Sequence, residues 1–260
     1  MPSTTVHHYA QISYGQLGIA FVLVAITLVL SRIERLGIEK DLLVGSVRSF
    51  AQLMAVGYVL QAIFSANKWY WVLLTLAVMT AVAGYTAAQR SKDIPRAKWI
   101  AVLSVGIGGL GTLGILVGLG IIEAAPWYVI PISGMILGNS MNGASLAMNR
   151  ISAEIKLRRA QIETALALGA TSRQAADPAL KAAAKAAMIP NINSMMTVGI
   201  VSLPGMMTGQ IIAGQAPTEA VRYQIVVTYM ITAAVTVASL TAALWSYRQF
   251  FTKEHQLLGE

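Results

Sequence analysis

Polar side chains inside long apolar runs are the residues of this sequence with the most distinctive chemistry. Arg48 falls within the run 42–64, and Gln52 follows it by one helical turn on the same face. A charge near the centre of a bilayer costs at least about 2.5–3.5 kcal/mol, so a retained arginine calls for an explanation. Arg48 indicates either a site that attracts anions or gates a path, or a side chain that extends along its helix to the membrane surface.

A second set of polar positions recurs at helical spacing in a later apolar run. The set is Met135, Asn139, Asn142, Ser145 and Asn149, which fall on one face of a helix. Polar side chains are unfavourable against lipid, so this face should turn toward protein or a water-filled path. It predicts either the lining of a transport path or hydrogen bonds between helices, each worth about 0.6 kcal/mol.

Methionine is frequent in the runs 128–148 and 189–212. Thioether sulfur is a soft donor that suits ions such as Cu(I), but methionine also fills gaps in protein interiors. Both interpretations stay open, and the sequence leaves any metal site unknown. The candidates for a transport path are Arg48, Gln52, Met135, Asn139, Asn142, Met195 and Met196.

Composition indicates the solvent in which these residues must be positioned. The chain is 56% hydrophobic and 12% charged, about half the charge of a soluble domain. The apolar residues form seven runs near the roughly 20 residues that a helix needs to cross a bilayer. We therefore expect an all-α polytopic membrane protein with a single permease domain over residues 1–260. The predicted spans are 14–30, 42–64, 69–88, 99–122, 128–148, 189–212 and 224–245.

The distribution of basic residues predicts the orientation. Of the 19 Lys and Arg residues, 16 fall on one side of the predicted spans, and only Lys68 and Arg222 fall on the other. The basic side is expected to be cytoplasmic, which places the N-terminus outside and the C-terminus inside a plasma membrane of the bacterial inner-membrane type. The net charge of +8 serves topology here rather than nucleic-acid binding. The chain has no cysteine, which excludes disulfides and cysteine nucleophiles.

The longest polar segment, residues 149–185, is predicted to form a cytoplasmic helical hairpin between the fifth and sixth spans. Residues 155–168 are good helix formers, and Gly169 follows as a residue that ends helices. Thr171 or Ser172 can then cap a second helix over residues 173–185. Pro178 should bend that helix or delay its start.

Glycine and proline indicate where two of the spans pack or bend. Seven glycines between residues 106 and 120 give the fourth span a small-residue surface, on which Gly114 and Gly118 allow close approach of another helix, either within the chain or at a subunit interface. Pro204 lacks a backbone donor and is expected to kink the sixth span. Together with Gly205 it is the candidate for a moving gate.

The stretch from Glu163 to Ala170, Glu-Thr-Ala-Leu-Ala-Leu-Gly-Ala, resembles the EAA motif of ABC-transporter permeases. In that family the segment forms a short coupling helix that docks in a groove of a cytoplasmic ATPase. The resemblance assigns this role to Glu163, Ala165, Gly169 and Ala170, although Lys181 and the next residue stand where the family often has Leu-Pro. The alternative is a helical hairpin without a coupling role.

A broader resemblance covers nearly the whole chain. The stretches 48–52, 131–142, 191–196 and 202–210 resemble the FetB-type permease family, which includes bacterial iron-export permeases and plant permeases linked to aluminium tolerance. The resemblance implies a homodimeric, membrane-embedded permease, not itself an enzyme, that exports iron or a related metal-linked solute. The chain has no Gly-x-x-x-x-Gly-Lys-Ser/Thr phosphate loop, so ATP and Mg²⁺ are expected on a separate ATPase subunit, with no cofactor in this chain.

Other classes of function fit the sequence less well. A stand-alone carrier or channel usually places ionisable residues or broken helices near the midplane, and only Arg48 qualifies. The predicted spans contain no Asp, Glu or His, which argues against an intramembrane enzyme. A scaffold remains possible. The same lack of hard donors makes a bare Fe(II) site poor, so a chelated or ligand-bound cargo suits the sequence better.

Overall fold

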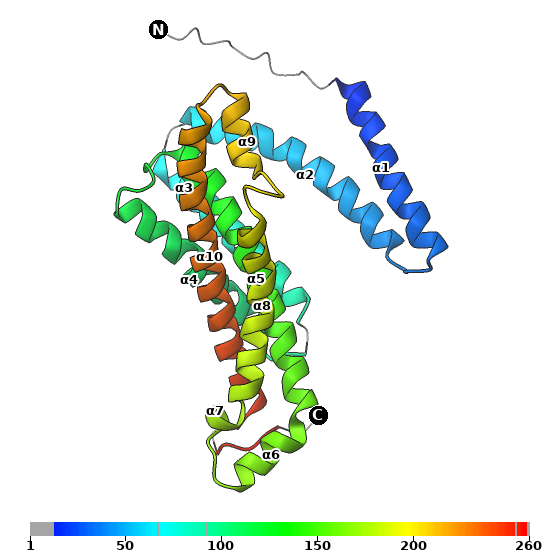
Figure 1. The fold of residues 1–260 in the computed structure, drawn as a ribbon, viewed down its shortest axis with the longest axis vertical. Helices are drawn as coiled ribbons and strands as arrows, with labels where there is room; N and C mark the ends of the chain where they lie inside the picture. Colours follow the sequence, from blue (N-terminus) through cyan, green and yellow to red (C-terminus); the bar gives the residue numbers. More distant parts are fainter. Residues whose placement is uncertain (1–12, 67, 92, 253, 259–260) are drawn as a thin grey trace. The chain divides into compact units, whose positions relative to one another are not determined.

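The computed structural model describes residues 13–66, 68–91, 93–252 and 254–258. Within these ranges the regular structure is helical, apart from two isolated β-bridges (Figure 1). Four of the described helices are long and apolar enough to cross a membrane: α2 (Glu39–Ala66), α3 (Trp69–Gln89), α4 (Ala97–Gly118) and α10 (Pro217–Tyr247). The all-α prediction is therefore confirmed for the described residues. The count of seven spans and their orientation stay predictions.

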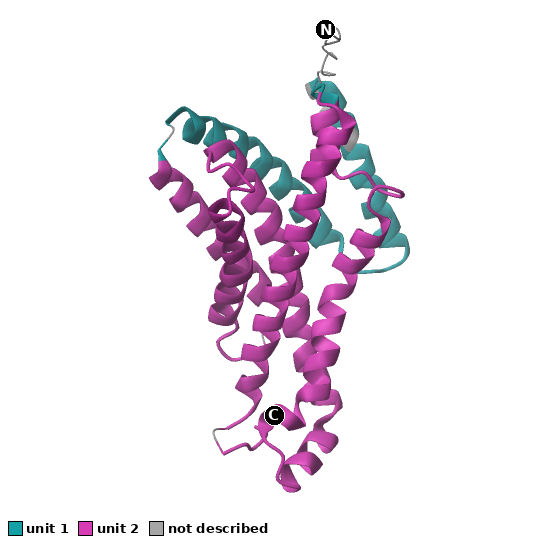
Figure 2. Ribbon diagram, turned by 60° about the vertical axis from the view of Figure 1, so that its left-hand side comes forward, with its two compact units in different colours: residues 1–68, 212–214 teal, residues 69–211, 215–260 magenta. Residues whose placement is uncertain are grey.

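The chain divides into two compact units, one of residues 1–68 and 212–214 and the other of residues 69–211 and 215–260 (Figure 2). We call them unit 1 and unit 2. Unit 1 contains α1 (Tyr14–Ile33) and α2. Ser13 caps α1 in a capping box with Gln16, which satisfies two of the free backbone donors at the helix start. Near the end of α1, Ser31 Oγ donates to a carboxylate oxygen of Glu39 at 3.0 Å, which ties the end of α1 to the start of α2.

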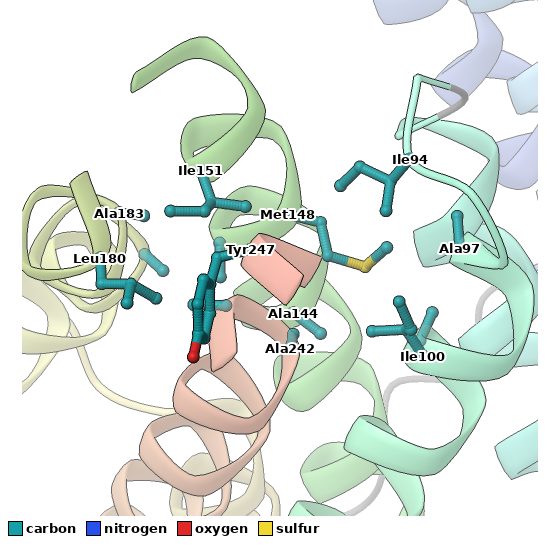
Figure 3. Close-up of a cluster of buried hydrophobic side chains, with 14 of the residues drawn as sticks. Ile94, Ala97, Ile100, Ala144, Met148, Ile151, Leu180, Ala183, Ala242 and Tyr247 are labelled. Atoms are coloured by element: carbon teal, nitrogen blue, oxygen red, sulfur yellow. The ribbon is translucent and has the colours of Figure 1, made fainter. Parts of the chain in front are cut away.

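Unit 2 is built around α5 (Pro126–Leu157) and α10, which lie side by side over much of their length. α3 and α4 pack on one another and on α5, while α8 (Asp177–Thr197) packs on both α5 and α10. Figure 3 shows the buried apolar cluster where these helices meet, with Met148 of α5 between side chains of α4 and α10. This cluster positions the helices that carry the polar residues considered below.

Two glycines allow the central helices of unit 2 to approach closely. A Cβ at Gly108 of α4 would lie 2.6 Å from the carbonyl oxygen of Ala234 in α10. A Cβ at Gly143 of α5 would lie 2.6 Å from Ser239 Oγ, also in α10. Gly114 and Gly118, which the sequence marks as a packing surface, have nothing within 4 Å among the described residues. The close helix contact therefore uses an earlier glycine of the same small-residue surface.

The predicted sixth span, residues 189–212, is wrong as a continuous helix. α8 begins at Asp177 and continues through Pro190 to Thr197, so the expected second helix of the hairpin and the first part of the span are one helix. Residues 198–204 are not helical, and α9 (Gly205–Ile212) follows. Pro178 lies in the first turn of α8, where a missing N–H costs little.

The break after α8 has a local cause. Gly199 has a φ of +85°, and an isolated bridge joins Val198 to Ser202, so the chain leaves the helical conformation there. Pro204 stands immediately before α9 rather than inside a helix, and its carbonyl oxygen accepts from the backbone N–H of Thr208 at 3.0 Å. The predicted kink of a continuous helix at Pro204 is accordingly replaced by an interruption that begins six residues earlier.

Candidate functional site

A polar cavity of about 330 Å³ lies within unit 2, between α5, α8 and α10. Its walls combine side-chain amides, hydroxyls and one thioether with apolar groups. The residues with polar or sulfur-containing side chains that line it are Asn139 and Asn142 of α5, Asn191, Ser194 and Met195 of α8, and Gln224 and Thr228 of α10. None of the described lining residues is ionisable. The cavity therefore suits a ligand that accepts and donates hydrogen bonds without a strong formal charge.

The cavity lies where α5 and α10 are in close contact with one another and α8 packs less closely against them. Gly143 and Val235 belong to its wall, at the point where α5 and α10 approach closely. Pro190 of α8 also lines it, and a proline within a helix removes one backbone hydrogen bond and favours a bend. Close packing on one side and a weakened helix on the other leave room for the polar side chains.

A small hydrogen-bonded cluster joins α8 to α10 beside this cavity. Asn191 Nδ2 donates to Thr232 Oγ1 at 3.0 Å. Thr232 Oγ1 lies 2.9 Å from both Met195 Sδ and the backbone oxygen of Thr228, either of which can accept its proton. Met195 is thus held by a hydroxyl group, which orients its sulfur at the cavity wall.

Gln224 supplies the most distinctive polar group of the cavity. Its side chain is only 9% exposed, and its Oε1 atom has no hydrogen-bond partner among the described residues. Its Nε2 atom donates to Thr228 Oγ1 at a long 3.4 Å. An unsatisfied buried acceptor costs about 1–3 kcal/mol, which a bound donor at this position would recover. The arrangement favours a ligand with an N–H, an O–H or a bound water.

The structure brings together some of the predicted path residues and not others. Asn139, Asn142 and Met195 line the cavity, as does the gate candidate Pro204, while Gly205 begins α9. Met135 and Met196 are not part of the wall, and Met196 is 75% exposed.

The predicted polar face of α5 is divided between different surroundings, and only part of it lines the cavity. Ser145 is buried, and Asn149 accepts a hydrogen bond from Ser91 Oγ at 3.1 Å, away from the cavity wall. Arg48 and Gln52 lie on α2 in unit 1 with exposed side chains. These two residues belong to a different compact unit from the cavity.

A compact helical turn joins α5 to α8 at one end of unit 2 (Figure 1). α5 gives way at Arg158 to α6 (Arg159–Ala167), and Gly169 reverses the chain with a φ of +91°. Thr171 then caps α7 (Ser172–Ala175) in a capping box, and α8 starts two residues after α7 ends. The local signals in the sequence thus place the turn correctly, although the second helix is split.

The residues that resemble the EAA motif lie on this turn. Glu163 is half exposed and accepts from Arg159 Nε at 2.9 Å. Ala165 is partly buried and packs on the apolar cluster of unit 2. Glu163, Gly169 and Ala170 line a cavity of about 460 Å³ whose other wall comes from residues 254–256 near the C-terminus. The turn is therefore anchored on one side by the apolar cluster and flanked on the other by residues 254–256.

Comparison with known proteins identifies the family to which the chain belongs. The model of a family described as "Uncharacterised protein family (UPF0014)" matches residues 14–251. The chain belongs to the UPF0014 family. It is 42% identical to Protein ALUMINUM SENSITIVE 3 of Arabidopsis thaliana over 92% of this chain and 87% of the relative. It is 38% identical to the "Probable iron export permease protein FetB" of Escherichia coli over 95% of each chain.

Further relatives carry the word membrane in their names. The chain is 41% identical to "UPF0014 membrane protein STAR2" of rice, over 92% of this chain and 84% of the relative. Together with the four apolar helices, these similarities show that the chain is a membrane protein of a permease family. The expected FetB-type relationship is confirmed. No solved structure matches the chain.

The UPF0014 chain places at the cavity several residues that were not predicted from the sequence. These residues are Asn191, Ser194, Gln224 and Thr228. Gln224, Thr228 and Thr232 follow one another at intervals of four, the same signal that drew attention to Asn139 and its neighbours. That periodicity could have identified the α10 wall, whereas the α8 wall depends on continuity through Pro190.

A buried carboxylate near the end of α5 was also missed. Glu154 is 2% exposed and is contacted by Arg150 Nη2 at 2.6 Å and Arg158 Nε at 2.7 Å. The hydrogen bond from Arg158 lowers the pKa of Glu154 against the opposing effect of its burial, and the positive charge of Arg150 adds to the lowering. The i, i+4 spacing of these three residues is the sequence signal that could have found them.

The segment after α10 folds back onto the turn. A bridge pairs Phe251 with Leu257, and Leu258 N donates to the backbone oxygen of Phe250 at 2.9 Å. His255 Nδ1 lies 2.9 Å from Ser172 Oγ, at the start of α7. The end of the described chain therefore braces the connection between α6 and α8.

Proposed function

We propose that the chain is the membrane subunit of an ATP-binding-cassette transporter that exports iron or a related metal-linked solute across a bacterial plasma membrane. A separate cytoplasmic ATPase would bind ATP and Mg²⁺ and drive the permease, which would work as a homodimer. The relative in Escherichia coli named as a probable iron export permease supports the cargo class. One structural observation carries the coupling role: the α6–α7 turn joins the two helices, α5 and α8, that form opposite walls of the polar cavity.

The turn can transmit a displacement because it is continuous with both helices. Ile155 of α5, Ile162 of α6 and Ala176 before α8 are all buried in the same apolar cluster. A partner that shifts α6 would therefore move the ends of α5 and α8 rather than slide over them. α10 and α4 are held together separately by the close contact at Gly108. Motion of α8 relative to α10 would widen or narrow the cavity.

The lining chemistry supports a ligand-bound form of the cargo. Iron as a bare ion prefers carboxylate, imidazole or other hard donors, and the described walls offer amide and hydroxyl groups with one thioether. These groups match the periphery of a chelate, which presents hydrogen-bonding atoms around a metal already coordinated. We propose that such a complex is what the cavity accepts.

Gly169 offers a direct test with a well-matched control. Gly169 has a φ of +91° and Gly214 a φ of +92°, and neither has an atom within 4 Å of an added Cβ among the described residues. Leucine at either position carries the same backbone strain, about 1–2 kcal/mol. We expect Gly169→Leu to abolish ATP-dependent loss of iron from iron-loaded cells while the protein still accumulates in the membrane. Gly214→Leu should retain most of the activity.

Purification in mild detergent completes this test. The wild-type chain should bring with it a stoichiometric subunit that carries a phosphate loop, and Gly169→Leu should release that subunit or stop its ATP hydrolysis. Equal export by the two variants would contradict the coupling role of the turn. Repeated purification without any ATPase would contradict the transporter assignment itself.

A second candidate function is a stand-alone carrier, and the interruption between α8 and α9 favours it. Secondary carriers often bind their solutes at helices broken within the membrane, and Pro204 at this interruption lines the cavity. Solute movement in proteoliposomes that contain only this chain would support the carrier. Movement that requires the ATPase would exclude it.

A further inference from the structure

The connection between α3 and α4, residues 90–96, carries an uncompensated positive charge. Arg90 and Arg96 are exposed, and their side chains make no hydrogen bond or ion pair within the described part of the chain. Lys98 lies over the ring of Tyr85, with its Nζ atom 5.5 Å from the ring centre. Asp93 is the described carboxylate of this connection, and Lys156 Nζ already neutralises it at 2.9 Å. Among the described residues, Arg90, Arg96 and Lys98 are left without a counter-ion.

Two cavities flank this connection and share Gln89 and Ile94 in their walls. The first, of about 340 Å³, includes Arg90 and Asn149 together with the ion pair of Asp93 and Lys156. The second, of about 700 Å³, combines Arg96 and Lys98 with aromatic and apolar groups. A ligand that spans both would meet cations and hydrogen-bonding groups at one end and an apolar surface at the other.

The cavity walls are fixed in place by the core of unit 2. Ile94 is 3% exposed, and Figure 3 shows Ile94, Ala97 and Ile100 directed toward Met148 of α5. Arg96 adopts a φ of +59° and provides no side-chain cap to α4, so the helix dipole adds a partial positive charge there. The basic side chains therefore project from a connection that the core holds in place. We call the region of Arg90, Arg96 and Lys98 the α3–α4 corner.

The position of this corner suggests what it binds. α3 and α4 are both long and apolar enough to cross a membrane, so their connection should lie at a membrane surface. Trp99 is 71% exposed and Tyr85 is 48% exposed, as expected for aromatic residues at the level of lipid headgroups. Basic pockets between membrane helices typically bind the phosphate of anionic lipids.

We propose that the α3–α4 corner binds the phosphate of an anionic phospholipid. Arg90, Arg96 and Lys98 would bind the headgroup, and an acyl chain would lie along Tyr85 and Trp99. A free phosphate shares the headgroup chemistry, but it would make no use of the exposed aromatic wall. This site lies on α3 and α4, away from the polar cavity, and does not depend on the transport role proposed above.

The test uses the purified full-length chain in an uncharged detergent. Phosphatidylglycerol and phosphatidylcholine with identical acyl chains are titrated, and native mass spectrometry reports the bound fraction of each. Each basic residue near a membrane surface contributes about fivefold to binding of anionic lipid, so Arg90→Gln/Arg96→Gln/Lys98→Gln should weaken phosphatidylglycerol binding by up to about 100-fold. Phosphatidylcholine binding should not change.

The control removes the same charge from the connection between α1 and α2. Arg32→Gln/Arg35→Gln/Lys40→Gln should keep the preference for phosphatidylglycerol. Equal losses in the two triple variants would show a general effect of net charge and overturn the site. Wild-type binding that does not distinguish the two lipids would overturn it as well.

Two further arms separate the lipid from soluble phosphate. Trp99→Ala should weaken phosphatidylglycerol binding, and inorganic phosphate should compete poorly with the lipid in the wild type. If inorganic phosphate displaces the lipid completely and Trp99→Ala binds as the wild type does, the corner is a site for soluble phosphate and the lipid assignment is wrong. The substituted side chains are exposed, so each variant is expected to fold.

Discussion

α4 and α8 both pack against α5 and α10, but they do so in opposite ways. α4 contacts its neighbours through Gly108 and Gly109, where a Cβ would meet atoms of α10 and α5 at 2.6 Å. α8 packs through the buried alanines Ala179, Ala183 and Ala187 and then becomes exposed beyond Pro190. The exposed fraction is 75% at Met196 of α8, and it is 90% at Ile200 and 79% at Val201 in the non-helical segment that follows.

This difference explains where the polar cavity forms. The contact of α4 with α10 leaves no space for movement without a clash, because backbone atoms of the two helices are already close. The contact of α8 depends on small side chains over half of the helix and on a few hydrogen bonds over the rest. The chain therefore combines the close contacts that α10 makes with α4 and α5 with a looser contact of α8, and the cavity lies between α8 and the α5–α10 pair.

The largest loss of stability is expected from a substitution in α4, where it contacts α10. Gly108→Ala places a Cβ 2.6 Å from the carbonyl oxygen of Ala234 and 2.8 Å from the backbone nitrogen of Ala238. Backbone atoms cannot rotate away, so the helices must separate, at a cost of about 3 kcal/mol. Thermal unfolding in mild detergent should show a midpoint lowered by roughly 6–12 °C for a chain of this size.

Gly111→Ala is the matched control on the same helix. Gly111 has nothing within 4 Å of an added Cβ among the described residues, and alanine favours the helix more than glycine does by about 1 kcal/mol. Its midpoint should stay the same or rise. A Gly108→Ala protein as stable as Gly111→Ala would mean that α4 and α10 are not in close contact.

The sequence predicts that α4 is a helix with a glycine-rich surface, but it does not predict which of these glycines contact other helices. Seven glycines between residues 106 and 120 indicate a helix surface suited to close approach. Only tertiary packing decides which turn is used: Gly108 and Gly109 face α10 and α5, and Gly114 and Gly118 do not. The apolar runs of α2, α3 and α4 were recognisable because length and composition alone mark them.

Along α8 the sequence misled for a physical reason. A proline within a helix usually marks a boundary or a kink, and Pro204 was predicted to kink a sixth span that was expected to begin at residue 189. The helix continues through Pro190 because its buried alanines hold it against α5 and α10 over the preceding turns. Local helix propensity does not include this tertiary stabilisation. For that reason Asn191 and Ser194 were not recognised from the sequence as neighbours of Asn139.

An intermediate loss of stability is expected at the end of α5 near the α6–α7 turn, where ion pairs rather than close packing stabilise the structure. Glu154→Gln removes the charge that Arg150 and Arg158 bind, and charge-assisted hydrogen bonds contribute about 2 kcal/mol. The matched control is Glu163→Gln, which also loses an i, i+4 partner, Arg159, but at an exposed site. Such surface pairs contribute about 0.3–0.5 kcal/mol, so its thermal midpoint should barely move.

The pH dependence provides a second measurement for Glu154. Its pKa in the folded chain is lowered from the ordinary value of 4.5, so its stabilising contribution is complete above that pH. The contribution is lost as the pH falls below 4.5 through the lower folded pKa. The wild-type midpoint should therefore drop more steeply than that of Glu154→Gln over this acid range. Parallel curves would show that the carboxylate is not stabilised by its two arginines.

The smallest effect is expected where α8 contacts α10 by hydrogen bonds. Thr232→Val keeps the shape of the side chain but removes the oxygen that accepts from Asn191 Nδ2 at 3.0 Å. Hydrogen bonds between membrane helices contribute about 0.6 kcal/mol, so the thermal midpoint should fall by only about 1–2 °C. Thr236→Val is the control, because the hydroxyl of Thr236 donates to the Thr232 carbonyl oxygen within α10.

A double-mutant cycle with Asn191→Ala isolates the bond between α8 and α10. The coupling free energy between Asn191 and Thr232 should be near 0.6 kcal/mol, while that between Asn191 and Thr236 should be close to zero. A coupling of several kcal/mol would mean that α8 is fixed to α10 as firmly as α4 is, and the contrast between a fixed and a movable helix would fail. A weak coupling places the freedom of motion in the half of α8 that carries Asn191 and Met195, where the polar cavity opens.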